Sequence, residues 1–341
     1  MHQATARFAL AVGCIMGLIT FGSWSRPAGV VASVTFPQGR PSASSPHSFI
    51  PLVARDFSPP APPAWLDYLN SYRDTAELAP LLEMANWSDG CWKHSRYMVK
   101  NGVVSHYESL GNTWYSPEGA LAAWYSNLVG NPTYGLSDEW AIDVFMQAPF
   151  HAVSIIDPQL RATGFGSYRE AVGSVRTAVA LDVLRGSASL PPGFSFPVMW
   201  PGDGESVALH QYVGYETPDP LTSCPGYAAP SGLPIILQIG AGSVTPAVTA
   251  HTFKQGNASL ESCVFDETNY KNSDSGLQQL GRDILNMRDA IVLVPRLPLT
   301  PGATYTASIT ANGRTYTWSF TVSATVHDVS TVAGPAALPA P

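Results

Sequence analysis

The sequence predicts an α+β protein in which a helical part precedes a part made of short strands. Three observations predict this class. Between residues 64 and 186, apolar residues recur at helical spacing behind residues that commonly begin helices. Between residues 195 and 323, short runs of β-branched and aromatic residues are divided by proline and glycine, a pattern typical of antiparallel sheets. The chain has 341 residues, of which 45% are hydrophobic and 13% charged, and this is enough for about two domains.

Residues 1–32 have the features of a signal peptide. Arg7 is the positively charged flank, residues 8–21 form the apolar core, and Val30-Val-Ala32 provides small residues for cleavage. The apolar core is shorter than the roughly 18 to 20 residues that a membrane helix needs. We therefore expect a mature chain without a transmembrane span, secreted or held at the cell surface, with an uncleaved anchor as the alternative.

Segments of low apolar content flank the two folded parts. Residues 33–63 are rich in Pro, Ser and Ala and end in Ser58-Pro-Pro-Ala-Pro-Pro63. Such a composition cannot bury enough apolar surface to offset the entropy of ordering, so this segment is expected to be a linker. Residues 324–341 are expected to be a flexible tail.

Four helices are expected between residues 64 and 186. Each has a start signal: a proline suited to the first turn, or a serine whose hydroxyl can cap the free backbone N–H groups. The four starts are Pro63, Ser88, Ser116 and Ser137, and Gly102 is the expected end of the second helix.

Polar residues on these helices have a structural interpretation. Glu118 and Glu139 lie in the first turns of the third and fourth helices, where a carboxylate complements the helix dipole by ~0.3 to 1 kcal/mol. His94 shares a face of the second helix with Cys91 and Met98. It is expected to be a buried histidine bonded to a backbone carbonyl.

A further interpretation of the same region comes from the order and spacing of seven short segments. The segments are Leu69-Asn-Ser-Tyr-Arg73, His94-Ser-Arg-Tyr-Met98, Val104-Ser-His106, Ser116-Pro-Glu118, Ala148-Pro-Phe-His151, Ile155-Ile-Asp-Pro158 and Gly164-Phe-Gly166. Together they resemble the bacterial branch of the CAP superfamily, the SCP-like extracellular proteins, which includes cysteine-rich secretory proteins, antigen 5 and pathogenesis-related proteins. The resemblance covers about residues 64–186 and implies a three-layer α-β-α sandwich with a central cleft holding two histidines and two acidic residues.

The resemblance implies the residues of the cleft. His106 and His151 match the two cleft histidines of the family, and Glu118 stands where the family has a Gly-Glu-Asn triplet. In this chain proline precedes Glu118 and glycine follows it, so the asparagine is missing. The second acidic residue has two candidates, Glu139 and Asp143, of which Glu139 is preferred.

This set of residues suits a ligand or a metal. Two neutral imidazoles with one or two carboxylates can hold zinc or another divalent cation and leave a position open for water. They can equally satisfy one another's hydrogen bonds in a polar cleft. The metal ligands would be His106 and His151, and Glu118 and Glu139 would complete the cleft.

The predicted function is an exported, non-enzymatic CAP module whose cleft binds a small molecule, a lipid or a divalent metal, with a cell-envelope or extracellular partner. Neither a His-Glu-x-x-His helix motif nor a Gly-x-Ser-x-Gly elbow is present. The alternative is a metal-dependent hydrolase acting on cell-envelope or peptide substrates, and a purely structural adhesin would need neither histidine. The net charge of −7 and the scattered Lys and Arg leave no basic stripe, so nucleic acid is not an expected partner.

Residues 195–323 are expected to form an antiparallel β-sandwich. Asn312-Gly313 predicts a tight hairpin between the last two strands. The end of this region, from Pro298 to Phe320, resembles bacterial Ig-like or fibronectin-like modules, which implies a role in attachment or spacing.

Cysteine counting predicts one disulfide. Cys224 and Cys263 are the only cysteines between residues 195 and 323, and an exported protein can keep them oxidised. On the chain-entropy model, closing the loop between them contributes roughly 4 kcal/mol. Cys91 is then expected to be a free, buried thiol.

The export signal makes a prediction about the mature N-terminus. Because Arg7 and the apolar run after it resemble a cleaved signal, the secreted protein should begin between about Ser25 and Gln38. Mass spectrometry of protein recovered from the culture medium measures this directly. Released protein that still carries Met1 would contradict the prediction.

Overall fold

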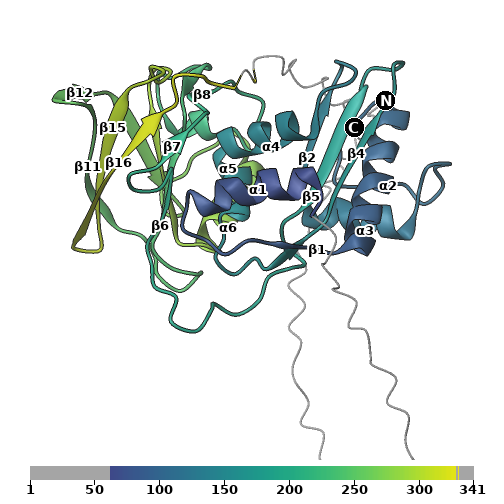
Figure 1. Ribbon diagram of the computed structural model, residues 1–341, viewed down its shortest axis with the longest axis horizontal. Helices are drawn as coiled ribbons and strands as arrows, with labels where there is room; N and C mark the ends of the chain where they lie inside the picture. The colour runs from purple at the N-terminus through teal and green to yellow at the C-terminus, as the bar shows by residue number, and fades with distance from the viewer. Residues whose placement is uncertain (1–61, 328, 330–341) are drawn as a thin grey trace, which may run out of the picture. The chain divides into compact units, whose positions relative to one another are not determined.

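The computed structural model describes residues 62–327 and 329 (Figure 1). The predicted signal peptide, the linker up to residue 61 and most of the predicted tail lie outside the described residues. The described residues belong to one compact unit. We call residues 62–186 its N-terminal part and residues 195–327 with 329 its C-terminal part. In the described range, every helix is too short or too polar to cross a membrane.

The N-terminal part contains helices around an antiparallel sheet of three strands, in the order β2-β5-β4. The strands are β2 (Ser126–Asn131), β4 (Phe165–Arg169) and β5 (Thr177–Asp182), with a small parallel pair formed by β1 (Leu82–Glu83) and β3 (Ala162–Thr163). The helices are α1 (Ala64–Asp74), α2 (Ala85–Asn101), α3 (Pro117–Tyr125), α4 (Asp138–Gln147) and α5 (Pro149–Ile155).

The sheet is covered on both faces, so all six residues of β5 are buried. Ala178 and Ala180 pack in a cluster with residues of α2 and α3. Val179 and Leu181 alternate with them and point into a second, larger core that includes α1 and α4. Figure 1 shows α2 and α3 on one side of the sheet and α1, α4 and α5 on the other. This is the α-β-α order that the sequence resemblance implies.

The predicted helix signals are largely confirmed. Ser116 and Ser137 cap α3 and α4 through hydrogen bonds from the N–H groups of Gly119 and Trp140. Gly102 ends α2 with a left-handed φ of 65°, a conformation that glycine adopts without strain.

The predicted start of α2 is wrong, because the helix begins at Ala85 instead of after Ser88. The Ser88 hydroxyl is used elsewhere. It donates to Glu83 and accepts from the backbone N–H of Phe165, so it ties α2 to β1 and β4.

The described C-terminal part contains two main sheets, in which most strands pair antiparallel, one α-helix (α6) and a short 3-10 helix (η1). The first has the order β13-β14-β10-β6, the second has the order β12-β11-β15-β16-β7, and β8 pairs with β9. The elements are β6 (Val198–Trp200), β7 (Ser206–Val207), β8 (Gln211–Tyr212), η1 (Pro220–Ser223), β9 (Ser231–Gly232), β10 (Ile235–Gln238), β11 (Val248–Gln255), β12 (Ala258–Leu260), β13 (Ser262–Asp266), α6 (Ser275–Asn286), β14 (Ala290–Pro295), β15 (Thr304–Ala311) and β16 (Arg314–Val322).

The turn predicted in this part is confirmed. Asn312 and Gly313 connect β15 to β16 with φ values of 51° and 75°, and positive values at both positions are what a type I′ hairpin needs. Two features go beyond a plain antiparallel sandwich, since α6 lies between β13 and β14 and β7 pairs in parallel with β16. Membership of the Ig-like class stays a prediction.

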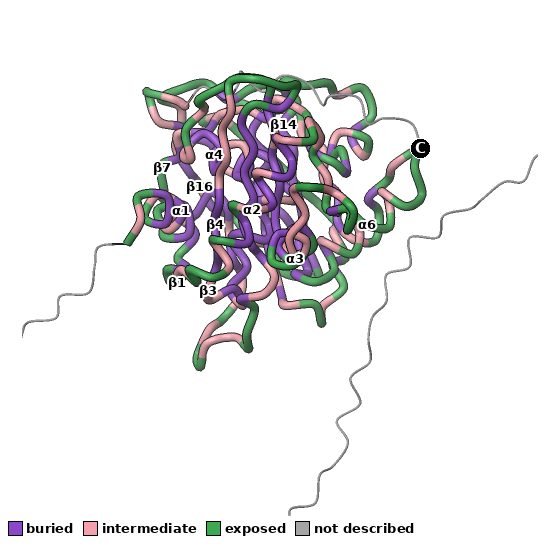
Figure 2. The backbone as a smooth tube through the Cα atoms, turned by 90° about the vertical axis from the view of Figure 1, so that its right-hand side faces the viewer, coloured by how far each residue is buried: buried purple, intermediate pink, exposed green. Residues whose placement is uncertain are grey.

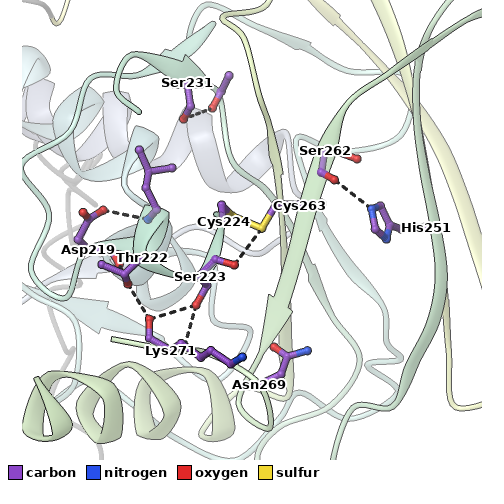
Figure 3. Close-up of a disulfide and its surroundings, with 12 residues drawn as sticks. Asp219, Thr222, Ser223, Cys224, Ser231, His251, Ser262, Cys263, Asn269 and Lys271 are labelled. Carbon is purple, nitrogen blue, oxygen red and sulfur yellow. Dashed lines mark hydrogen bonds between the residues drawn. A yellow bond between two sulfur atoms is a disulfide. The ribbon is translucent and has the colours of Figure 1, made fainter. Parts of the chain in front are cut away.

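The predicted disulfide is confirmed, and Figure 3 shows it joining Cys224, at the end of η1, to Cys263 in β13. The two Cα atoms are 5.6 Å apart. Cys91 is free and fully buried on α2, and burial raises the pKa of its thiol to about 12. A thiol in that state is inert, because the thiolate is the reactive form.

The two parts share one core, and α5 is the element at the junction. Phe150 packs against Phe265 and Tyr270, with ring centroids 6.0 and 5.0 Å away. The side chain of Gln238, in β10, donates to the carbonyl of Val153 at 3.1 Å. In Figure 2 the buried residues run through the interior of the folded molecule, and β14 is among them.

The close packing of α2 on β4 makes a prediction about Gly166. A Cβ atom added there would lie 2.0 Å from the backbone nitrogen of Trp92, so one of the two elements would have to move. Gly166→Ala should therefore lower the free energy of unfolding by about 1–3 kcal/mol, the usual effect of overpacking. Urea denaturation measures this change. Gly111→Ala is the matched control, since nothing lies within 4 Å of its added Cβ, and equal stabilities of the two variants would contradict the described packing.

Candidate functional site

A buried pair holds the segment that carries His106. The side chains of His94 and Glu108 are fully buried, and the Nδ1 atom of His94 lies 2.9 Å from Oε1 of Glu108. Nε2 of His94 donates to the carbonyl of Ser105 at 2.8 Å, which confirms its structural role. The other oxygen of Glu108 accepts the N–H of Ser116, where α3 begins. The pair thus fixes both ends of the segment between α2 and α3.

His106 lies on this segment with a defined ring orientation. Its Nδ1 atom is 2.7 Å from the carbonyl oxygen of Ala123. Because a carbonyl only accepts, Nδ1 carries the hydrogen, and the neutral ring has its lone pair on Nε2. The residue reaches the surface, but packing around the ring lowers its pKa. The hydrogen bond to Ala123 opposes this shift, and positive charge on His151 or His94 adds to it.

His151 is oriented by a residue of the C-terminal part. Its Nδ1 atom is 2.7 Å from Oε1 of Glu216, and its backbone N–H donates to the same oxygen at 2.8 Å. An oxygen that accepts one hydrogen bond in this way favours Nδ1–H as the second donor, so Nε2 again has the lone pair. The ring stacks on Phe145, and 20% of the side chain is exposed, whereas that of Glu216 is fully buried.

Charge on His151 adds to the lowering of the His106 pKa, and the expectation that the two rings share one cleft stays a prediction. Both rings have Nδ1 bound to a protein acceptor. Among the residues that the structure describes, neither Nε2 atom has a hydrogen-bond partner.

Glu118 faces a different neighbour. Its side chain is exposed, and its carboxylate lies 3.3 Å from Nζ of Lys93, which also pairs with Asp89. Its own backbone N–H, at the start of α3, and then Lys93 lower its pKa. The contacts with this backbone N–H and with Lys93 are those expected of a carboxylate in the first turn of a helix.

The two candidates for the second acidic residue, Glu139 and Asp143, lie near a cluster of tyrosines. Asp143 accepts hydrogen bonds from the hydroxyls of Tyr68, at 2.5 Å, and Tyr72, and it lies 3.0 Å from Nδ1 of His327. Burial raises the pKa of Asp143, against the effect of these hydrogen bonds. Burial also raises the pKa of Tyr68, and charge on Glu139 adds to this shift.

Glu216 is the acidic residue that sequence reasoning missed. It follows β8, far along the chain from the histidine that it contacts, and no motif surrounds it. Only the packing of the two parts brings it to His151.

A metal site near His106 and His151 would need several ligating side chains close together. Within residues 62–327 and 329, no group of three or more His, Cys, Asp or Glu side chains is placed to hold a metal ion. Zinc sites use three or four protein ligands. The two imidazoles alone do not fit a resident zinc ion.

A comparison with known families identifies the N-terminal part. The family described as the cysteine-rich secretory protein family, CAP, matches residues 66–181, the span from α1 to β5. This match supports the predicted superfamily for residues 66–181. No curated protein matches the sequence.

The buried pair makes a prediction about stability. Glu108→Ala removes the partners of His94 Nδ1 and of the Ser116 N–H, and each buried polar group left alone costs about 1–3 kcal/mol. The variant should unfold at clearly lower urea concentration than wild type. Glu118→Ala is the control, and it should change the transition little because that side chain is exposed. If the two substitutions had equal effects, the segment would not depend on the buried pair.

Proposed function

We propose that the protein is an exported CAP-domain protein whose cleft binds a small ligand between His106 and His151. The observation that supports this best is the matched state of the two rings. Each donates from Nδ1 to a protein acceptor, the Ala123 carbonyl for His106 and the Glu216 carboxylate for His151, and each keeps Nε2 for a ligand. In the proposed arrangement the two rings act on one ligand, in keeping with the effect of His151 charge on the pKa of His106.

The chemistry of two free Nε2 atoms defines the ligand class. A neutral imidazole nitrogen accepts hydrogen bonds from hydroxyl or N–H groups, and it also binds divalent metals such as zinc. An ion held by these two nitrogens alone would keep open positions for water or for a bound ligand. A ligand that donates hydrogen bonds, with or without a weakly held metal, therefore fits better than a permanently bound ion.

The surface beside His106 favours a ligand with an apolar portion. Tyr107 follows His106 directly, and Trp124 follows the residue whose carbonyl binds the His106 ring. Their exposed fractions are 59% and 66%. Exposed aromatic side chains next to polar acceptors suit an amphipathic small molecule or a lipid.

The other parts of the proposal concern location and attachment. We propose that residues 1–32 direct export, so that the domain works outside the cell or at its surface. The C-terminal part would serve attachment or spacing, as its resemblance to Ig-like modules implies. The hydrolase alternative would require a bound metal to activate water, and we prefer the binding function because, among the described residues, the proposed site supplies two imidazoles and no third metal ligand.

Zinc alone is a suitable probe of the two nitrogens, because it binds neutral imidazoles. Calorimetric titration of the full secreted chain at neutral pH should show binding that His106→Ala combined with His151→Ala abolishes. Glu118→Gln, which removes an exposed charge near the same helices, should bind as wild type does.

The same calorimetric titration, repeated at several pH values, tests the charge state of the two histidine rings. Binding should weaken as pH falls through about 6.5, the ordinary pKa of histidine, because protonated rings release the metal. Since its surroundings lower the pKa of His106, this ring stays neutral to lower pH than a free histidine. Equal zinc binding by wild type and the double variant would contradict the proposed site.

A further inference from the structure

Glu216 lies outside the segment that matches the CAP family, yet it contacts a residue inside it. Its carboxylate is fully buried and receives both the ring N–H and the backbone N–H of His151 through one oxygen. The C-terminal part thus supplies the direct partner of a cleft histidine.

The loop around Glu216 is anchored on both sides of the junction. The backbone N–H of Glu216 donates to the hydroxyl of the buried Tyr212 at 3.2 Å. The backbone N–H of Val213 donates to the side chain of Gln147, the last residue of α4 in the N-terminal part, at 2.9 Å. These two hydrogen bonds hold the backbone of the loop in the position from which the Glu216 carboxylate contacts His151.

The backbone next to Glu216 adopts an uncommon conformation. Tyr215 has a φ of 76°, in the left-handed region that residues other than glycine rarely adopt. Tyr215 is 52% exposed, while the next residue turns inward and is buried. Strain of this kind persists where the surrounding structure requires it, often at functional sites.

The carboxylate is more than a convenient acceptor for the end of α5. The Glu216 side chain is fully buried, and a carboxylate at a buried position is unfavourable without a partner. Its second oxygen, Oε2, is buried and accepts no hydrogen bond from the described residues. A neutral side chain could accept the backbone N–H of His151 without the desolvation penalty of a buried charge.

We infer that Glu216 is a positioning residue for the proposed ligand site: it holds His151 in the Nδ1–H form and fixes the plane of its ring. This inference rests on the proposed function of the cleft. A carboxylate bonded to one ring nitrogen keeps the other nitrogen available and correctly aimed, an arrangement used around metal-bound and reacting histidines. The CAP domain of this chain therefore depends on the C-terminal part for a complete site.

The ring tautomer tests the inference directly. Nitrogen-15 NMR of the full chain at neutral pH should show His151 of the wild type with hydrogen on Nδ1 and none on Nε2. Glu216→Ala should give a mixture of the two forms at His151. His106 should stay unchanged as an internal control, because a backbone carbonyl holds its ring.

Two further variants separate positioning from folding. Glu216→Gln keeps an oxygen that can accept both bonds of His151, so it should preserve the Nδ1–H form. Asp219→Asn removes a charge from an exposed residue of the same loop and should leave His151 unaltered. A wild-type His151 with hydrogen on Nε2 would overturn the inference without any variant, even if Glu216→Ala failed to fold.

Zinc affinity connects this result to function. If wild type binds zinc, Glu216→Ala should bind about 10–100-fold more weakly, the usual effect of losing a partner behind a metal-bound histidine. Unchanged affinity in that variant would overturn the positioning role. If wild type does not bind zinc, the use of metal as a probe of the proposed function fails, and the tautomer of His151 alone decides the inference.

Discussion

The burial of α5 is the constraint on which the arrangement of the two parts depends. Every residue of this short helix except His151 is buried, so its polar groups need partners from both sides. The first residue of α5 is Pro149, which has no N–H to donate. The residue before it, Ala148, has no side chain that could cap the helix. Glu216 accepts the backbone N–H of His151 in the first turn, and this N–H also donates to the carbonyl of Ala148 at 3.1 Å. The same contact that completes the helix also orients the ring that reaches the surface.

Buried polar side chains secure the other end of α5. The guanidinium of Arg73, from α1, is almost fully buried and donates to the carbonyls of Ile155 and Asp157 at 2.6 and 3.0 Å. Arg288, from the C-terminal part, lies 3.1 Å from the carboxylate of Asp157. Such groups are expensive to leave without partners, so they fix one way of joining the two parts. The position of His151 follows from that packing.

Local signals could be predicted from the sequence, and long-range contacts could not. Ser116 and Ser137 identified two helix starts, and Asn312-Gly313 identified a hairpin, because each acts on neighbouring backbone groups. The start of α2 was mispredicted because Ser88 bonds to β1 and β4 instead of capping its own helix. The order and spacing of short segments that resemble the CAP superfamily pointed to His106 and His151 as candidate site residues. Glu216 carried no signal, since only the folded junction brings it beside His151.

We predict that the imidazoles of His106 and His151 share one cleft, and the influence of one ring on the titration of the other tests this most directly. Positive charge on His151 contributes to lowering the pKa of His106. Proton NMR titration of the His106 ring should therefore show a higher pKa in the His151→Gln variant than in wild type, because the neighbouring charge is gone. A His106 pKa that does not change with this substitution would mean that the rings are too far apart to act on one ligand.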